Sequence, residues 1–279
     1  MPERPDLEHQ VPIVARRLVG ATITAVRVKK PVVLRAPVAT DVLVGRTVRD
    51  VRRMGHFIAV SLDGDWDMVI HLMLAGRFAF VRAGTKDSAD LAVAWGLGDD
   101  ELRYRDDVQM GKVYLVPSGD YTSVPGMLPV GVDVLGPGFT PAILAGLAKK
   151  RREQVKVFLK DKNTFDSFGN AYADETLWEA GIHPKATVAS LTPEQLARLH
   201  GAMVKVLRDA RDEIARRDPP LDEKVRDFLA VRNRGGEPCP RCGTKIRSAG
   251  VHGHDAFFCP VCQPDEKGKG MVDWRGVGK

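Results

Sequence analysis

Four cysteines, the only ones in the 279-residue chain, occur as two pairs near its C-terminal end. Cys239 and Cys242 form one Cys-x-x-Cys pair, and Cys259 and Cys262 form the second, with sixteen residues between the pairs. Four thiolates at this spacing complete a tetrahedral Zn²⁺ shell and leave no position open for water or substrate. Two reduced redox pairs are the alternative, but no thioredoxin-like βαβ pattern surrounds them. The spacing therefore predicts one structural zinc ion per chain.

The residues between the cysteine pairs are expected to form a hairpin. Residues 245–247 and the pair at 257–258 suit its two strands, and residues 252–255 (His-Gly-His-Asp) would form its tip. A zinc ion that fixes both ends would present this tip rigidly. Nucleic-acid contact and protein contact are both uses for such a tip, and the module alone does not choose between them.

Composition and charge limit the functions that the chain can have. Hydrophobic residues make up 44% of the chain, as in a folded protein. No apolar run approaches the roughly 20 residues that a bilayer span needs. The first six residues are acidic and interrupted by proline, so they do not resemble a secretory signal, and a cytoplasmic location follows by default. A formal charge of +6 and a pI near 9.2 allow a polyanionic partner without requiring one.

The hydrophobic pattern changes its period along the chain. Residues 6–18 place apolar side chains on one helical face, and short alternating or β-branched runs follow up to about residue 118. From Thr192 onward, a capping pattern and an apolar stripe at helical spacing predict a long helix. The predicted class is α+β, divided into an antiparallel β-sandwich at 1–118, a Gly- and Pro-rich linker at 119–140, a helical domain at 141–232, and the cysteine module with a basic tail at 233–279.

Four separate segments resemble, in order, those of the formamidopyrimidine-DNA glycosylase and endonuclease VIII family. They are residues 1–8 (MPERPDLE), residues 71–76 (HLMLAG), Lys156 with residues 169–175 (GNAYADE), and the cysteine module. Any one of them could arise by chance, but four in the same order are highly specific. The resemblance implies a β-sandwich with an N-terminal helix, a helix–two-turn–helix domain and a zinc-finger hairpin.

The resemblance further implies a base-excision repair DNA glycosylase with β-lyase activity and no catalytic metal. Its nucleophile would be Pro2, the first residue once Met1 is removed. An unperturbed α-amino group has a pKa of about 8, against about 10.4 for lysine, so more of it is uncharged near pH 7. Glu3 would handle proton transfer to the opening sugar ring. From residues 1–3 alone, an ordinary frayed terminus is the alternative.

The family also implies which side chains contact DNA. His71, Lys156 and Asn170 match positions that bind phosphates around the damaged nucleotide, where a turn before a helix N-terminus favours anions. Tyr172 would support that turn, and a plain packing role for it is an equal alternative.

Base eversion leaves a gap in the stack that the enzyme must fill. Leu74 and Met110 occupy two of the gap-filling positions and remain apolar. Val108 occupies the third, where the family usually has an arginine. Because valine has no side-chain donor, recognition of the base opposite the lesion should be weak.

Other positions depart from the family pattern. His56 replaces a lysine and fits a general acid, a packed residue or a phosphate ligand equally. His254 replaces the zinc-hairpin arginine and would bind phosphate more weakly and in a pH-dependent way. Asp6 stands where a glutamate is expected. The chain also passes from Arg226 to Gly236 without the longer excursion that covers 8-oxoguanine, so we expect little specialisation for that lesion and a preference for ring-fragmented, pyrimidine, bulky or absent bases.

Two other functions stay open at this point. A damage-binding protein of the same fold with little or no turnover is compatible with the histidines at positions 56 and 254. An RNA or protein binder that uses the zinc module has no positive support. The expected partner is damaged double-stranded DNA, bound by a monomer at the nucleoid without any membrane.

Overall fold

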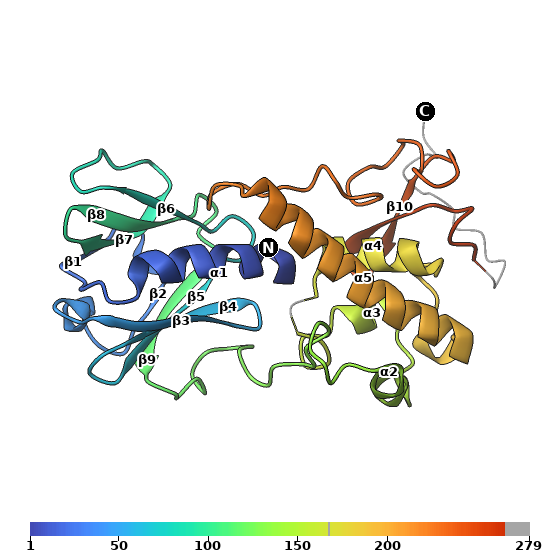
Figure 1. Cartoon of the computed structure of the whole chain (residues 1–279), viewed down its shortest axis with the longest axis horizontal. Coiled ribbons are helices and arrows are strands. Elements are labelled where there is room, and N and C mark those ends of the chain that lie inside the picture. Colours follow the sequence, from blue (N-terminus) through green and yellow to red (C-terminus); the bar gives the residue numbers. More distant parts are fainter. Residues whose placement is uncertain (167, 266–279) are drawn as a thin grey trace. The chain divides into compact units, whose positions relative to one another are not determined.

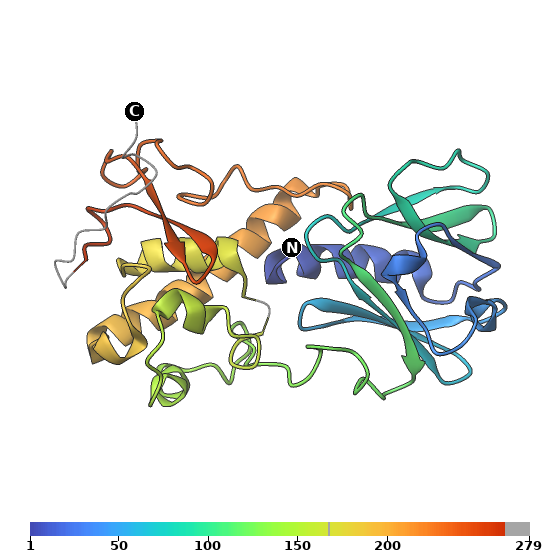
Figure 2. The ribbon, with the colours of Figure 1, turned by 180° about the vertical axis from the view of Figure 1, so that it is seen from behind.

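The computed structural model describes residues 1–166 and 168–265, which form two compact units (Figures 1 and 2). The first unit contains residues 1–130 and 211–225. The second contains the described residues of 131–210 and 226–265. Helix α5 (Pro193–Arg217) begins in the second unit and ends in the first. The basic tail expected after the cysteine module lies outside the described residues.

Two β-sheets make up most of the first unit. One has the strand order β2-β9-β5-β4-β3 and the other the order β1-β7-β8-β6. Paired strands are antiparallel except for β2 and β9, which are parallel. The strands are β1 (Ala25–Val28), β2 (Leu34–Arg35), β3 (Val48–Met54), β4 (Phe57–Leu62), β5 (Trp66–His71), β6 (Arg77–Arg82), β7 (Leu91–Leu97), β8 (Asp100–Arg105) and β9 (Lys112–Pro117), with short 3-10 helices at Pro31–Val33 and Thr40–Leu43.

One hydrophobic core joins both sheets to helix α1 (Arg4–Leu18). The sheets contribute fully buried side chains such as Ile58, Phe78 and Trp95. Helix α1 packs against β3 and adds the buried residues Leu7, Val11, Val14 and Leu18, which recur at helical spacing. Each such side chain stabilises the fold by about 1.5–3 kcal/mol relative to exposure, so the core fixes the start of the chain against the sheets.

Helices dominate the second unit. They are α2 (Pro141–Ala148), α3 (Val155–Leu159), α4 (Asn170–Ala180) and the greater part of α5, with a 3-10 helix at Val188–Ser190. Their common core includes the buried residues Phe158, Tyr172 and Leu207. A hairpin of β10 (Arg247–Val251) and β11 (His254–Phe258) packs against α4.

The capping pattern predicted before α5 is confirmed. The Thr192 amide donates to Gln195 Oε1 at 2.9 Å, and the Gln195 amide donates to Thr192 Oγ1 at 3.2 Å. These reciprocal bonds satisfy two donors that a helix start leaves without intrahelical partners.

The α+β class is confirmed, with the predicted order of sandwich, helical region and cysteine hairpin. Two strand boundaries differ: β10 begins at Arg247 and not at Lys245, and β11 begins at His254, within the tip expected at residues 252–255. Lys245 instead pairs with Pro238 in an isolated bridge, so the turn around the first cysteine pair takes residues that the pattern assigns to the strand. Among the described residues, we find no helix long and apolar enough to cross a bilayer.

Candidate active site and metal centre

A reciprocal capping interaction fixes the residues at the N-terminus. Glu3 is the N-cap of α1, and its amide donates to Asp6 Oδ2 at 2.7 Å while its carboxylate accepts from the Asp6 amide. Pro2, Glu3 and Asp6 are all buried. The backbone of the first helical turn therefore fixes the Glu3 carboxylate, on the residue that follows Pro2. These reciprocal bonds form a capping box, in which Asp6 stands in place of the longer glutamate that the family pattern predicts. The capping role of Asp6 is not predicted from the sequence, although its spacing from Glu3 is that of a capping box.

The two candidate histidines of the first unit lie near one end of the β4–β5 pair. Phe57 is opposite His71 in the register of the two strands, and their rings stack with centroids 4.5 Å apart. His56 directly precedes Phe57 in the turn between β3 and β4. Both histidines are buried. The fold thus brings together two residues that come from different sequence segments.

Leu74, Val108 and Met110 lie on two loops and keep 57%, 53% and 41% of their surface exposed. Leu74 lies between β5 and β6, and the other two lie between β8 and β9. Exposed side chains of this size on ordered loops suit insertion into a base stack.

The buried hydroxyl of Tyr104 lies between these two loops. A Cβ atom at Gly76 would lie 2.7 Å from Tyr104 Oη, and one at Gly111 would lie 1.7 Å from the same atom. Both positions therefore need glycine: the tyrosine hydroxyl fills the space at Gly111, and the Leu72 carbonyl oxygen, 2.3 Å from a Cβ at Gly76, fills it there together with the hydroxyl. The hydroxyl donates to Asp106 Oδ2 at 3.2 Å.

Asp106 organises the loop that carries Val108 and Met110. Its fully buried carboxylate accepts hydrogen bonds from the amides of Val108 (3.1 Å), Gln109 (2.9 Å) and Gly111 (2.8 Å). Gln109 has a φ of 60°, a left-handed conformation that these bonds hold. Sequence reasoning misses Tyr104 and Asp106, because their partners are set by loop geometry and not by a local pattern.

Residues 218–224 run from the end of α5 along the first unit. The Gln10 amide group donates to the Leu221 carbonyl at 3.3 Å, and Arg105 pairs with Asp222 at 3.2 Å. Lys224 Nζ donates to the Leu74 carbonyl at 2.7 Å. This segment therefore supports the backbone of the loop that carries Leu74.

Lys156 in the second unit forms a buried ion pair. Its Nζ donates to Asp174 Oδ1 at 2.6 Å and to the Asp255 carbonyl at 2.6 Å, and its side chain is 1% exposed. Arg232 donates to the other Asp174 oxygen at 2.8 Å and to the same Asp255 carbonyl at 3.0 Å. The Lys156 ammonium, which the family resemblance places near a phosphate, thus joins α3 to α4 and to the hairpin.

Asn170 and Tyr172 lie in the first turn of α4. Asn170 follows the N-cap Gly169, and within the described part of the chain its buried Oδ1 has no hydrogen-bond partner. Tyr172 is fully buried; its hydroxyl accepts from Arg226 at 3.1 Å, and the guanidinium lies 5.1 Å from the ring centroid. The tyrosine packs in the core and orients Arg226.

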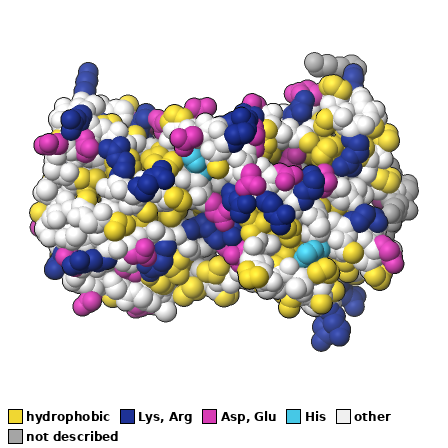
Figure 3. Space-filling model, viewed as in Figure 1, with side chains coloured by type: hydrophobic (Ala, Val, Ile, Leu, Met, Phe, Trp, Pro, Cys, Tyr) yellow, Lys and Arg dark blue, Asp and Glu magenta, His cyan; other side chains and the backbone are white. Residues whose placement is uncertain are grey.

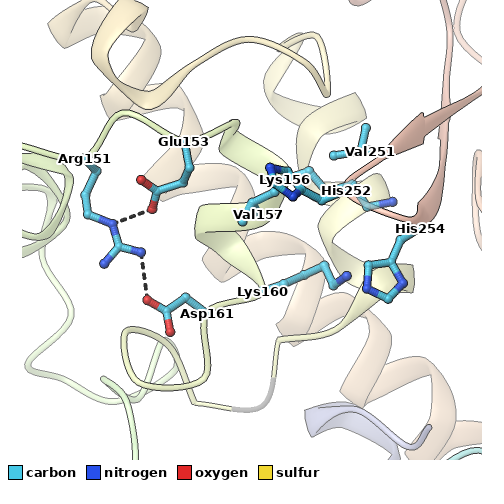
Figure 4. A pocket seen from close by; sticks show the side chains of 9 residues that line it. All are labelled: Arg151, Glu153, Lys156, Val157, Lys160, Asp161, Val251, His252 and His254. Atoms are coloured by element: carbon cyan, nitrogen blue, oxygen red, sulfur yellow. Dashed lines mark hydrogen bonds and ion pairs between the residues drawn. The ribbon is translucent and has the colours of Figure 1, made fainter.

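His254 is exposed at the start of β11 and lines a hollow together with Lys160. Lys160 follows Lys156 by four residues, a helical spacing that could have identified it from the sequence. Lys and Arg side chains are spread over the face shown in Figure 3 and alternate with acidic ones. Lys160 and His254 extend toward one another across the hollow (Figure 4).

The four cysteines converge on one point, with all Sγ atoms within 4.8 Å of one another. The Sγ–Sγ separations include 3.9 Å for Cys239–Cys262, 3.4 Å for Cys242–Cys259 and 3.5 Å for Cys242–Cys262. A tetrahedral Zn²⁺ with Zn–S bonds of about 2.3 Å requires sulfur separations of about 3.8 Å, so the cluster fits this ion. Cys239, Cys242, Cys259 and Cys262 would hold it and lock the base of the hairpin.

Further contacts position the sulfurs. Trp178 Nε1 donates to Cys239 Sγ at 3.4 Å, and the Cys262 amide donates to Cys259 Sγ at 3.4 Å. The Arg241 guanidinium lies 4.2 Å from the Trp178 ring centroid. Gln263, which is fully buried, joins the Cys259 amide to the Ile182 carbonyl. The cluster is thereby tied to α4 and to the residues after it.

Three family models match successive parts of the chain. The formamidopyrimidine-DNA glycosylase N-terminal domain matches residues 1–113, the H2TH domain of the same proteins matches residues 130–216, and the zinc finger found in FPG and IleRS matches residues 236–264.

Similar curated proteins and solved structures span nearly the whole chain. The formamidopyrimidine-DNA glycosylase of Geobacillus kaustophilus is 34% identical over 274 residues, which are 94% of this chain and 100% of that protein. The crystal structure of the MutM (Fpg) protein from Thermus thermophilus is 30% identical, with a TM-score of 0.82 over 94% of this chain and 98% of that one. A complex between Lactococcus lactis Fpg and DNA containing an abasic site is 25% identical, with a TM-score of 0.84 over 94% and 99%.

Replacing Gly111 by Ala should destabilise the first unit by about 2 kcal/mol, a usual cost of overpacking, because the new Cβ would meet Tyr104 Oη. Urea unfolding followed by circular dichroism measures the change. In a Tyr104→Phe background, which lacks the clashing oxygen, the same substitution should cost clearly less. Equal costs in both backgrounds would show that the tyrosine hydroxyl does not impose the glycine.

Removal of the metal should disorder the cysteine hairpin and leave the β-sandwich folded. Structural zinc contributes about 10–16 kcal/mol of binding free energy in small zinc modules. We expect one zinc per purified chain by elemental analysis, and faster amide exchange in β10 and β11 after chelation with amides of β4 and β5 unchanged. Cys242→Ser should reproduce the chelated state; full hairpin protection without zinc would contradict the assignment.

Proposed function

Because the chain belongs to the formamidopyrimidine-DNA glycosylase family, we propose that it excises damaged bases from double-stranded DNA and cleaves the abasic site that remains. The observation that carries the proposal is the capped first turn, which fixes the carboxylate of Glu3, the residue directly after Pro2. A chain of this family needs a positioned amine and a positioned carboxylate for both steps. One chain with one structural zinc ion acts at each lesion.

The Pro2 nitrogen attacks C1′ of the damaged nucleotide, and the bond between C1′ and the base breaks as the base takes a proton. The nitrogen then passes its proton to the Glu3 carboxylate, which delivers this proton to O4′ as the C1′–O4′ bond opens. The freed lone pair of the nitrogen forms a cationic iminium with C1′. Loss of a C2′ proton to a base expels the 3′ phosphate. Water finally hydrolyses the iminium and frees Pro2. The proposed scheme uses Pro2, Glu3 and water and involves no metal ion.

The attacking atom exists only after processing. In the encoded chain the Pro2 nitrogen is part of the peptide bond with Met1 and has no lone pair for attack. Removal of Met1 creates a secondary amine, whose attack on C1′ gives an iminium that stays cationic and draws electrons from C2′.

We assign His56 as the donor that protonates the departing base. It is buried next to the β4 strand, and imidazole exchanges a proton near neutral pH, which the ammonium of an ordinary lysine does not. In this proposal three further side chains contact DNA phosphates. They are His71 at the same end of the sheet, Asn170 at the start of α4, and His254. Lys156 and Tyr172 are positioning residues. Lys156 holds the hairpin through the Asp255 carbonyl, and Tyr172 orients Arg226.

The proposed substrates are ring-fragmented, pyrimidine, bulky or absent bases rather than 8-oxoguanine. The segment from Arg226 to Gly236 is short and its backbone is pinned, because the Glu175 carboxylate accepts from the amides of Ala230, Val231 and Arg232 at 2.7, 2.9 and 2.8 Å. A backbone held by three such bonds has little freedom to fold over a purine.

A binding protein without turnover is the second candidate function, and the replacements at His56 and His254 favour it. It predicts tight association with damaged duplexes and no covalent intermediate. A borohydride trapping experiment separates it from the enzyme.

Borohydride reduction should trap the processed protein on a duplex that contains an abasic site, because hydride reduces the iminium to a stable amine. A form that retains Met1 should lower the trapped fraction by at least about 100-fold, because its Pro2 nitrogen is an amide and no longer a nucleophile. Pro2→Gly should lower it less, because its primary amine still forms an imine that borohydride reduces. Pro5→Ala is the matched control, since Pro5 also lies in the first turn but carries no free amine. Binding without any adduct on any lesion would establish the binding protein instead.

His56→Gln in the same assay tests the proton donor. Excision of an intact damaged base should fall by about 100-fold, whereas trapping on a preformed abasic site should change little, because no base remains to be protonated. Equal losses on both substrates would assign His56 to phosphate binding.

A duplex panel tests substrate choice. Ring-opened purines and oxidised pyrimidines should be excised faster than 8-oxoguanine, with little dependence on the opposite base. Val108→Arg should introduce a preference of about tenfold for cytosine opposite the lesion, the effect of one or two new hydrogen bonds. Val108→Leu, which adds bulk without hydrogen-bond donors, should leave the excision rate similar for every opposite base. A strong cytosine preference in the unmodified chain would contradict the assignment.

A further inference from the structure

The loop between β8 and β9, residues 106–111, is held through both its amides and its carbonyls. The Asp106 carboxylate accepts from three of its amides. The Lys112 ammonium donates to three of its carbonyl oxygens, those of Gln109 at 3.3 Å, Met110 at 3.1 Å and Gly111 at 3.1 Å. The loop backbone is therefore fixed by side chains of the first unit, without help from a ligand.

Gln109 holds a backbone conformation that glutamine rarely adopts. Its φ of 60° lies in the left-handed region, which costs free energy for a residue with a Cβ atom and suits glycine or asparagine better. The hydrogen bonds from its amide to Asp106 and to its carbonyl from Lys112 offset this cost. A backbone outlier on a loop expected to enter DNA points to a functional reason for the side chain.

The side chain of Gln109 is exposed, and its amide forms no hydrogen bond within the part of the chain that the structure describes. Its neighbours Val108 and Met110 are also exposed but carry no strong hydrogen-bonding group. The exposed carboxylate of Asp107 only accepts, and it lies 4.0 Å from the Arg77 guanidinium. Among the exposed side chains of this loop, Gln109 therefore offers both a donor and an acceptor.

The base left opposite an everted nucleotide presents a donor next to an acceptor, whichever base it is. Cytosine offers its N4 amino group beside N3, adenine its N6 amino group beside N1, guanine N1–H beside O6, and thymine N3–H beside O4. A glutamine amide carries the matching pair, and a half-turn about its last side-chain bond exchanges the donor and the acceptor. One glutamine can therefore form two hydrogen bonds with each of the four bases.

We propose that Gln109 hydrogen-bonds the base opposite the lesion in either orientation of its amide, and that this contact makes excision nearly independent of the opposite base. The inference rests on the proposed function, in which side chains of this loop fill the gap that the everted nucleotide leaves. It goes further, because the missing donor at Val108 explains only the loss of a preference, whereas Gln109 supplies a bond to every base.

Single-turnover excision of a ring-opened purine by the full-length processed chain tests the proposal on four duplexes that differ only in the opposite base. The unmodified chain should give four rates within about threefold of one another, a spread smaller than one net hydrogen bond produces. Gln109→Leu, similar in size but without polar atoms, should lower all four rates by about tenfold. With a stable abasic analogue opposite the lesion, this difference should disappear, because no base is present to bind.

Gln109→Glu separates a base contact from a structural role in the loop. A carboxylate only accepts, and guanine is the base with two adjacent donors, N1–H and its 2-amino group. This variant should therefore excise about tenfold faster opposite guanine than opposite the other bases. Gln109→Arg, which only donates, is the inverse control and should favour cytosine, whose N3 and O2 are adjacent acceptors. Comparing duplexes within one variant removes any general effect of the new charge on DNA affinity.

An equal loss of rate by Gln109→Leu on all five duplexes would assign Gln109 to loop structure or to a phosphate and overturn the inference. Unchanged ratios in both charged variants, with normal excision and borohydride trapping, would also overturn it and leave the proposed function intact. Absence of excision and of trapping by the unmodified chain on every duplex would overturn both.

Discussion

The catalytic proposal depends on holding the first residue of a chain, a place where a polypeptide is ordinarily mobile. No preceding residues can anchor Pro2 after Met1 is gone. The reciprocal bonds between Glu3 and Asp6 supply the anchor by making residue 3 part of α1. The helix in turn is fixed by Leu7, Val11 and Leu18 in the sandwich core. In the proposed mechanism, the burial of α1 in the core therefore gives the Pro2 amine and the Glu3 carboxylate defined positions.

The same principle recurs in the loops that present apolar side chains. Leu74 and Met110 are exposed, so packing of their own side chains does not order them. The loops are ordered by buried polar side chains. Asp106 binds three loop amides, and the Tyr104 hydroxyl packs against two loop glycines. A flexible wedge would lose conformational entropy on insertion, and a loop ordered in advance loses less.

Features that depend on residues close together in the sequence are predicted correctly. Periodicity identifies α1, the Thr192 cap marks the start of α5, and the cysteine spacing identifies the metal cluster. The sequence does not reveal partners that lie far apart in the chain. Lys156 reads as a phosphate ligand by its place in a motif, but its ammonium binds Asp174 and the carbonyl of Asp255, 99 residues away. Such pairings arise only when α3, α4 and the hairpin pack together, and no local pattern encodes them.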